Sequence, residues 1–125
     1  MKLLDTTVAI DHLRGHAPAV ALLRKLIEDG ETVFASEVVR FELLAGVRVN
    51  ELEALERFFS AIGWVAVDEG VTRAAGSLAR KHRRTHGGID DVDYIIAATA
   101  LLLDAQLLTT NVRHFPLLRD IEAPF

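Results

Sequence analysis

Short apolar segments alternate with longer amphipathic segments along this chain. Each short segment is a predicted strand, because it is a run of mostly apolar residues followed directly by Asp, Ser or Thr, which favour turns and helix caps. The predicted strands are 2–4, 32–35, 64–67 and 106–109. Helices are predicted over 6–13, 19–28, 37–46, 50–62, 69–86 and 91–103, and Asn111 is expected to cap another. This alternation predicts an α/β fold, with a mainly parallel sheet covered by helices on both faces.

The composition fits a single α/β domain over residues 1–125. Half of the residues are hydrophobic and only 6% are aromatic, which favours helices packed on a sheet over an aromatic-rich β-sandwich. No linker or internal repeat interrupts the pattern, and 125 residues are enough for one hydrophobic core.

Several classes of protein are excluded by residues that are missing from the sequence. The chain has no cysteine, so a metal ion would be bound by oxygen or imidazole ligands and not by thiolates. No apolar run approaches the roughly 20 residues of a membrane span. Residues 1–15 contain Asp5, Asp11 and Arg14, where a signal peptide needs an uninterrupted apolar stretch. We therefore expect a cytoplasmic protein.

Three acidic residues belong to three separate predicted elements. Asp5 follows the first strand, at the carboxyl edge where parallel sheets bind ligands. Glu42 shares a helix face with Val38 and Ala45. Asp93 stands at the head of the buried face of its helix. Each acid also has a simpler explanation by itself, because acids at helix starts are commonly caps and a glutamate at the edge of an apolar stripe commonly reaches solvent.

Together the three acids are more informative than each of them is alone. If they converge, carboxylates about 4 Å apart repel each other by roughly 4 kcal/mol at an effective dielectric constant of 20. No Lys or Arg occupies a matching inward position, so a divalent cation is the simplest way to remove that cost. Mg²⁺ prefers oxygen ligands and supports phosphodiester cleavage, so the pattern indicates a Mg²⁺ site with a hydrolytic function.

The charge is distributed unevenly along the chain. A net charge of −4 argues against a surface that binds nucleic acid everywhere. Basic residues are nevertheless concentrated in one run, which consists of Arg80, Lys81, His82, Arg83 and Arg84. By composition alone this run is as compatible with a solvated helix face as with a contact to RNA or to a partner protein.

Four segments resemble the motifs of the PIN-domain family, and most closely those of the VapC-type toxins. They are 3–11, with Leu-Leu-Asp-Thr-Thr; 36–46, with Phe-Glu-Leu; 93–100, which begins Asp-Tyr-Ile-Ile-Ala; and 108–115, with Thr-Thr-Asn-Val. Together they span residues 3–115 in the family's order and spacing. The resemblance implies a PIN-like three-layer α/β/α sandwich and a Mg²⁺-dependent endoribonuclease in which Mn²⁺ can substitute.

The same resemblance implies a biological role and partners. VapC-type toxins cleave RNA and thereby inhibit translation and growth, and we expect tRNA or rRNA as the substrate of this chain. They are commonly homodimers. A VapB-type antitoxin, whose tail occupies the active cleft, neutralises them.

The resemblance also assigns roles to individual residues. Asp5, Glu42 and Asp93 match the acidic metal-binding positions, and Thr6 matches a hydroxyl that supports them. At the fourth position many relatives have an aspartate where this chain has Asn111, so one negative charge is missing. The Asn111 carbonyl can still bind the cation or orient a water. The supporting positions are Thr110 and Asp91, and the expected RNA contacts are Arg80, Lys81, Arg83, Arg84 and Arg113.

A second interpretation stays open beside the ribonuclease. The chain could be a regulatory or interaction module that keeps the PIN fold with weak catalysis, and Asn111 is the residue that favours it. A phosphoacceptor receiver domain is excluded, because there is no paired acid at the first strand and no lysine after a late strand.

Overall fold

Four parallel strands form the centre of the structure, a computed structural model that describes residues 1–85, 87–119 and 121–125. They are β1 (Lys2–Leu4), β2 (Val33–Ser36), β3 (Gly63–Val65) and β4 (Gln106–Leu108). Their order across the sheet is β3, β2, β1, β4, so the first and the last strand of the chain are neighbours. Because all neighbours are parallel, the carboxyl ends of the strands lie at one edge of the sheet.

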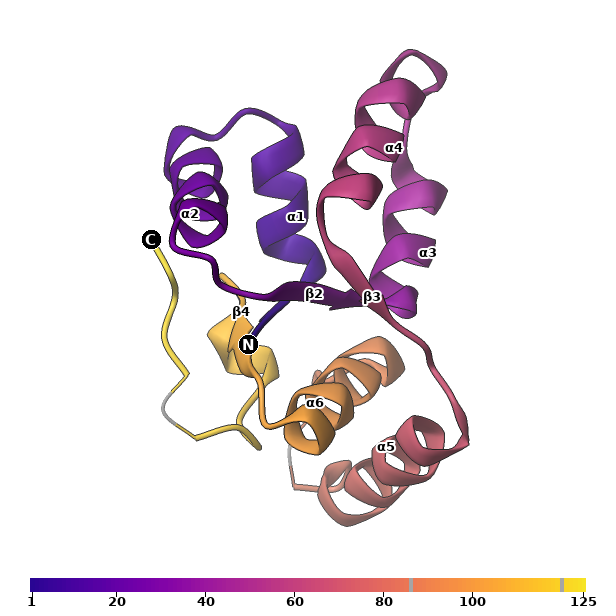
Figure 1. Cartoon of the computed structure of the whole chain (residues 1–125). Coiled ribbons are helices and arrows are strands. Elements are labelled where there is room, and N and C mark those ends of the chain that lie inside the picture. The colour runs from indigo at the N-terminus through magenta and orange to yellow at the C-terminus, as the bar shows by residue number, and fades with distance from the viewer. Residues whose placement is uncertain (86, 120) are drawn as a thin grey trace.

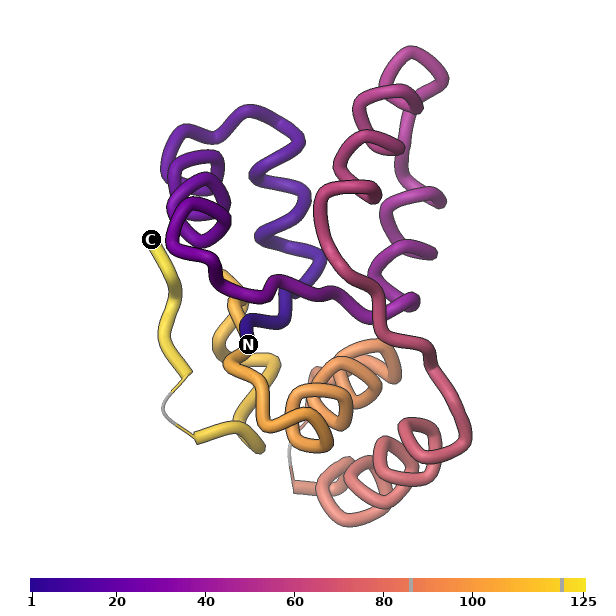
Figure 2. Tube along the Cα trace, viewed as in Figure 1, coloured from indigo at the N-terminus to yellow at the C-terminus, as the bar shows by residue number. Residues whose placement is uncertain are grey.

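Helices cover both faces of this sheet (Figure 1). They are α1 (Thr6–Leu13), α2 (Ala17–Glu28), α3 (Glu37–Gly46), α4 (Leu52–Ala61), α5 (Glu69–His82) and α6 (Asp91–Leu103). The first four lie on one side of the sheet, and α5 and α6 lie on the other, as the trace in Figure 2 also shows. This arrangement confirms the predicted three-layer α/β/α sandwich with a parallel sheet.

The hydrophobic core lies between the sheet and both helix layers. Leu3 and Leu4 of β1 are fully buried, because this strand has a neighbour on each side and helices above and below. From Ile96 to Ala100, α6 is buried throughout, and it contacts α5, α3 and β4. This most apolar helix has 13 residues, and nowhere in the described part of the chain is there a helix long and apolar enough to cross a membrane.

The third strand lies one residue earlier than the sequence predicts and is shorter. β3 pairs only with β2, with Gly63 opposite Phe34 and Val65 opposite Ser36. A Cβ at Gly63 would overlap the Phe34 ring, so a glycine is needed where the two strands come together. Beyond Val65 no partner remains, because β2 ends at Ser36 and the chain turns into α3. The prediction of a strand over 64–67 was therefore wrong at both ends.

Several helix boundaries also differ from the prediction. The segment 50–62 begins with a 3₁₀ turn, η1 (Val49–Glu51), before α4. Helix α5 ends at His82, and its expected end, His86, lies outside the described residues. After Asn111 the chain makes a single 3₁₀ turn, η2 (Val112–His114). This helix does not continue, because Pro116 lacks an N–H group and disfavours a helical residue before it.

Candidate metal centre

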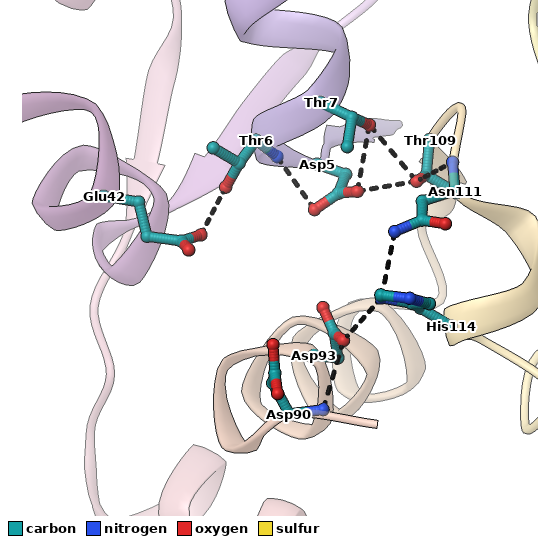
Figure 3. A network of polar contacts seen from close by, with 9 residues as sticks. All are labelled: Asp5, Thr6, Thr7, Glu42, Asp90, Asp93, Thr109, Asn111 and His114. Carbon is teal, nitrogen blue, oxygen red and sulfur yellow. Dashed lines mark hydrogen bonds and ion pairs between the residues drawn. The ribbon is translucent and has the colours of Figure 1, made fainter. Parts of the chain in front are cut away.

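Asp5 lies at the carboxyl end of β1 and is the N-cap of α1. Its side chain is buried, with 4% of the residue exposed. Oδ1 accepts the N–H of Thr6 at 2.8 Å, and Oδ2 accepts the hydroxyls of Thr7 at 3.0 Å and Thr109 at 2.6 Å. Asp5 is thus both a helix cap and a carboxylate fixed in one orientation by short hydrogen bonds (Figure 3).

Thr7 and Thr109 connect the ends of β1 and β4. The Asp5 N–H donates to the Leu108 carbonyl at 2.9 Å, which brings the residues after the two strands together. The Thr109 hydroxyl also accepts the Asn111 N–H at 2.9 Å, and the Thr7 hydroxyl accepts the Thr110 N–H at 3.1 Å. Neither Thr7 nor Thr109 has a role that was predicted from the sequence. The available signal was a hydroxyl residue at the end of each of two strands, but their contact depends on β4 lying next to β1.

Glu42 lies on α3, at the edge of its buried face. The expected apolar stripe with Val38 and Ala45 is wrong, because Ala45 is exposed and the buried residues of α3 are Val39 and Leu43. Glu42 is half-buried, and its Oε1 accepts the Thr6 hydroxyl at 2.5 Å. The structure therefore brings Thr6 and Glu42 into direct contact, from α1 and α3.

Asp93 is in the first turn of α6 with 13% of its side chain exposed. Its Oδ2 accepts the Asp90 N–H at 3.3 Å, as a capping acid does, and lies 3.0 Å from His114 Nδ1. Burial raises the pKa of Asp93 above its usual range, opposed by the Asp90 N–H and by His114. The negative charges of Asp5 and Asp90 also raise the pKa of Asp93, so Asp93 responds electrostatically to Asp5.

His114 lies between the side chains of Asn111 and Asp93 and contacts both. The amide Nδ2 lies 2.9 Å from His114 Nδ1, and the Asn111 side chain does not cap η2, contrary to the expectation. His114 thereby connects the third and fourth motif segments, a contact that was not predicted from the sequence. Thr110 and Arg113, on either side of these residues, are exposed.

The carboxylates of Asp5, Glu42 and Asp93 point toward a common space in Figure 3. Within residues 1–85, 87–119 and 121–125, none of the three forms an ion pair with Lys or Arg. Across the same residues, no three side chains of His, Cys, Asp or Glu stand close enough together to hold a metal ion. The donor set is of the kind that hard divalent cations prefer, but the carboxylates would have to draw closer to share one.

The remaining predicted positions lie farther out. Asp91 is exposed, and its Oδ1 accepts a hydrogen bond from Arg83 at 2.5 Å. The Arg83 guanidinium also lies over the Tyr94 ring, 5.6 Å from its centroid. Arg83 therefore contacts two residues of α6. Arg80, Lys81 and Arg84 are exposed at the end of α5.

A groove of about 600 Å³ opens beside Glu42, between α1, α3 and α4. Its walls include the apolar residues Ile10, Leu43 and Leu55, and Arg14 and Arg48 also line it. Two large apolar side chains of α3, Phe41 and Leu44, are exposed. An acid of the candidate centre thus forms part of a partly apolar depression.

A family model described as the PIN domain matches residues 2–119. The chain belongs to the PIN-domain family. In this PIN domain the four motif segments recognised in the sequence contribute Asp5, Glu42, Asp93 and Asn111, which Figure 3 shows around one space. The match spans both helix layers and all four strands of the described structure, so it confirms the fold assignment.

Two relatives of this PIN domain are named ribonucleases. The chain is 62% identical over 125 residues to Ribonuclease VapC19 of Mycobacterium tuberculosis (strain ATCC 25618 / H37Rv), with 100% of both chains covered. It is 38% identical to Ribonuclease VapC10 of the same strain, covering 100% of this chain and 93% of the relative. A solved structure described as a toxin-antitoxin complex from Klebsiella pneumoniae has the same fold, with a TM-score of 0.81 at 20% identity, covering 100% of this chain and 98% of the other.

Proposed function

We propose that this PIN domain is a divalent-metal-dependent endoribonuclease, with Mg²⁺ as its cation and Mn²⁺ as a substitute. The observation that supports this most is the 62% identity to Ribonuclease VapC19 over the whole chain. The acidic centre agrees with it, because three carboxylates without a Lys or Arg ion pair in the described residues point toward one space. We propose tRNA or rRNA as the substrate.

Each side chain of the centre has a role in this proposal. Asp5, Glu42 and Asp93 would hold the cation, which when bound supplies a Lewis acid for hydrolysis of a phosphodiester. Thr7 and Thr109 orient Asp5, and Thr6 holds Glu42.

The basic residues have a separate role in binding the substrate. Exposed Arg80, Lys81, Arg84 and Arg113 would bind RNA phosphates, whereas Arg83 is engaged with Asp91. Substitution of a phosphate contact is expected to weaken binding of every RNA sequence to a similar extent.

Cleavage of a total RNA preparation by the purified chain with Mg²⁺ or Mn²⁺ tests the activity. We expect cleavage, its loss with a chelator, and its loss in Asp5→Asn, Glu42→Gln and Asp93→Asn. Asp104→Asn is the matched control for Asp93→Asn, because Asp104 is exposed at the opposite end of α6. If Asp93→Asn cleaves as well as Asp104→Asn, the acidic centre is not the active site.

We also propose that the chain is the toxin of a VapBC-type pair in the cytoplasm. The groove beside Glu42 has apolar walls for a segment of a VapB-type antitoxin, which would cover the acidic centre. Ala54→Glu, within the groove, should weaken co-purification with the antitoxin, whereas Ala61→Glu, exposed on the same helix outside it, should not. Equal capture of both variants would contradict this binding site.

The assembly and the domain organisation complete the proposal. We propose one PIN domain over residues 1–125 that forms a homodimer, since large apolar side chains such as Phe41, Leu101 and Leu102 are exposed. Light scattering after size-exclusion chromatography measures the mass, and a mass of one chain would contradict the dimer.

A regulatory PIN module with weak catalysis is the second candidate, favoured by Asn111 at the fourth position. Induced expression of the chain in a host cell distinguishes the ribonuclease from the regulatory module. The active toxin should stop growth of the host cell while Asp93→Asn should not. If both proteins leave growth unchanged and purified protein binds Mn²⁺ without cutting RNA, the regulatory module is the better description.

A further inference from the structure

One nitrogen atom of His114 contacts two side chains of the acidic centre. Its Nδ1 lies 3.0 Å from Asp93 Oδ2 and 2.9 Å from Asn111 Nδ2. An imidazole nitrogen either carries a hydrogen and donates it or lacks one and accepts. His114 therefore cannot donate to Asp93 and accept from Asn111 at the same time, and one of the two partners has to adapt.

Binding of the proposed cation determines which of the two partners, Asp93 or Asn111, has to change its hydrogen bond with His114. An acid that binds a metal ion is ionised, and an ionised carboxylate only accepts hydrogen bonds. Nδ1 then carries the hydrogen and donates to Asp93. The amide atom of Asn111 beside Nδ1 has to be an acceptor as well, and the only acceptor of an amide is its oxygen. A half-turn about the Cβ–Cγ bond exchanges the amide nitrogen and oxygen in place.

The same hydrogen bond determines which end of Asn111 faces the acids. In Figure 3 the amide atom in contact with His114 is on the side of the carboxylates, and the other amide atom is turned away from them. We propose that His114 is a positioning residue whose single Nδ1 hydrogen is shared between Asp93 and Asn111, and which so turns the Asn111 carbonyl oxygen toward the cation. This inference rests on the proposed function, because it concerns the metal-bound state.

With His114 in this role, an asparagine can serve at the fourth position. A carboxylate presents an oxygen in either orientation, whereas an amide has one end that binds a cation and one end whose N–H groups repel it. An aspartate at position 111 would need no residue to select its orientation. Asn111 needs one, and His114 is in contact with it.

Calorimetric titration of the full chain with Mn²⁺ tests the role of His114. His114→Phe keeps a ring without a nitrogen, and we expect it to weaken Mn²⁺ affinity by about tenfold, as is usual for residues that orient metal ligands. His114→Asn has an amide nitrogen at the place of Nδ1 and can donate to both partners. We expect it to retain affinity within about threefold of the natural chain. An equal loss in both variants contradicts the donor role.

The substitution Asn111→Asp distinguishes a positioning role of His114 from a general structural effect of replacing His114. In an Asn111→Asp background we expect His114→Phe to weaken Mn²⁺ affinity by less than about threefold. No amide remains to be oriented, and Asp93 Oδ2, which loses the hydrogen bond from His114, is still held by the Asp90 N–H. A tenfold loss in both backgrounds overturns the proposal.

Urea unfolding of all variants identifies any loss of Mn²⁺ affinity that comes from a loss of the fold. If the natural chain cleaves RNA and binds Mn²⁺ but His114→Phe binds it equally well, only this inference fails; if the natural chain binds no Mn²⁺, the proposed function fails with it.

Discussion

The two ends of α1 surround a buried polar atom in opposite ways: one supplies hydrogen-bond partners and the other does not. At the first end, Asp5 accepts hydrogen bonds from the Thr6 N–H and from two threonine hydroxyls. At the other end, His12 packs against the Phe58 ring, with the ring centroids 5.5 Å apart. Its Nδ1 is buried and has no hydrogen-bond partner among the described residues.

The difference shows how the fold accommodates a charge and a neutral group. A buried carboxylate is costly unless donors surround it, and the chain places three of them around Asp5. An imidazole can give up its charge, and burial lowers the pKa of His12 below its usual range. The end of α1 that faces the acidic centre therefore surrounds a carboxylate with hydrogen-bond donors, whereas burial at the far end disfavours the charged form of His12.

The largest expected effect is at Asp5. Asp5→Ala removes the helix cap and leaves the Thr6 N–H and the Thr109 hydroxyl without their acceptor, so the free energy of unfolding should fall by about 2–3 kcal/mol. Urea unfolding followed by circular dichroism measures it. Asp11→Ala on the same helix is the control and should change the free energy of unfolding by less than about 0.5 kcal/mol. Equal losses would mean that the donors around Asp5 contribute little.

A smaller effect is expected at Thr109, which can be compared with a second buried threonine. Thr109 and Thr99 are both at most 1% exposed, but the Thr109 hydroxyl connects Asp5 with Asn111, whereas the Thr99 hydroxyl donates to Ile95 in its own helix at 2.7 Å. Thr109→Val should lower the free energy of unfolding by about 1–2 kcal/mol. Thr99→Val should cost less, because its helical carbonyl keeps a backbone partner. The reverse order would contradict the importance of the network.

The smallest effect is expected at His12 and depends on pH. Its pKa in the folded chain lies below that in the unfolded chain, so the unfolded state binds more protons between the two values. Stability should therefore fall as the pH drops below about 6.5, the ordinary value for histidine. In His12→Leu the loss between pH 8 and pH 5 should be smaller than in the natural chain. Urea unfolding at both pH values measures the two losses, and identical losses would show that His12 does not charge on unfolding.

Much of the fold could be predicted because its signals are local. Apolar runs and the residue directly before a helix determine the strand 2–4, the helix 91–103 and the capping residues Asp5 and Ser36. The predictions were wrong where a distant segment decides the outcome. β3 ends at Val65 because β2 has no further residue to pair with, and no pattern within 64–67 contains that information.

The acidic residues of the candidate site could be proposed from the sequence, but the residues that contact them could not. Asp5, Glu42 and Asp93 were identified from their positions after a strand and on helix faces and from the resemblance to PIN domains, and the structure places them around one space. Whether they bind a metal stays a prediction. The residues that hold them, Thr109 and His114, were missed because each contacts an acid at least 21 positions away in the sequence.

By itself, the sequence determined the alternation of strands and helices, the acidic residues after a strand and on helix faces, and the likeness to the PIN-domain family. These features follow from periodicity, capping and short motifs, which act within a few residues of each other. Only the tertiary structure decided that β4 lies beside β1, that two threonine hydroxyls hold Asp5, and that His114 joins Asp93 to Asn111. Hydrogen bonds of this kind depend on side-chain positions within a few tenths of an ångström, and packing of the whole chain sets those positions.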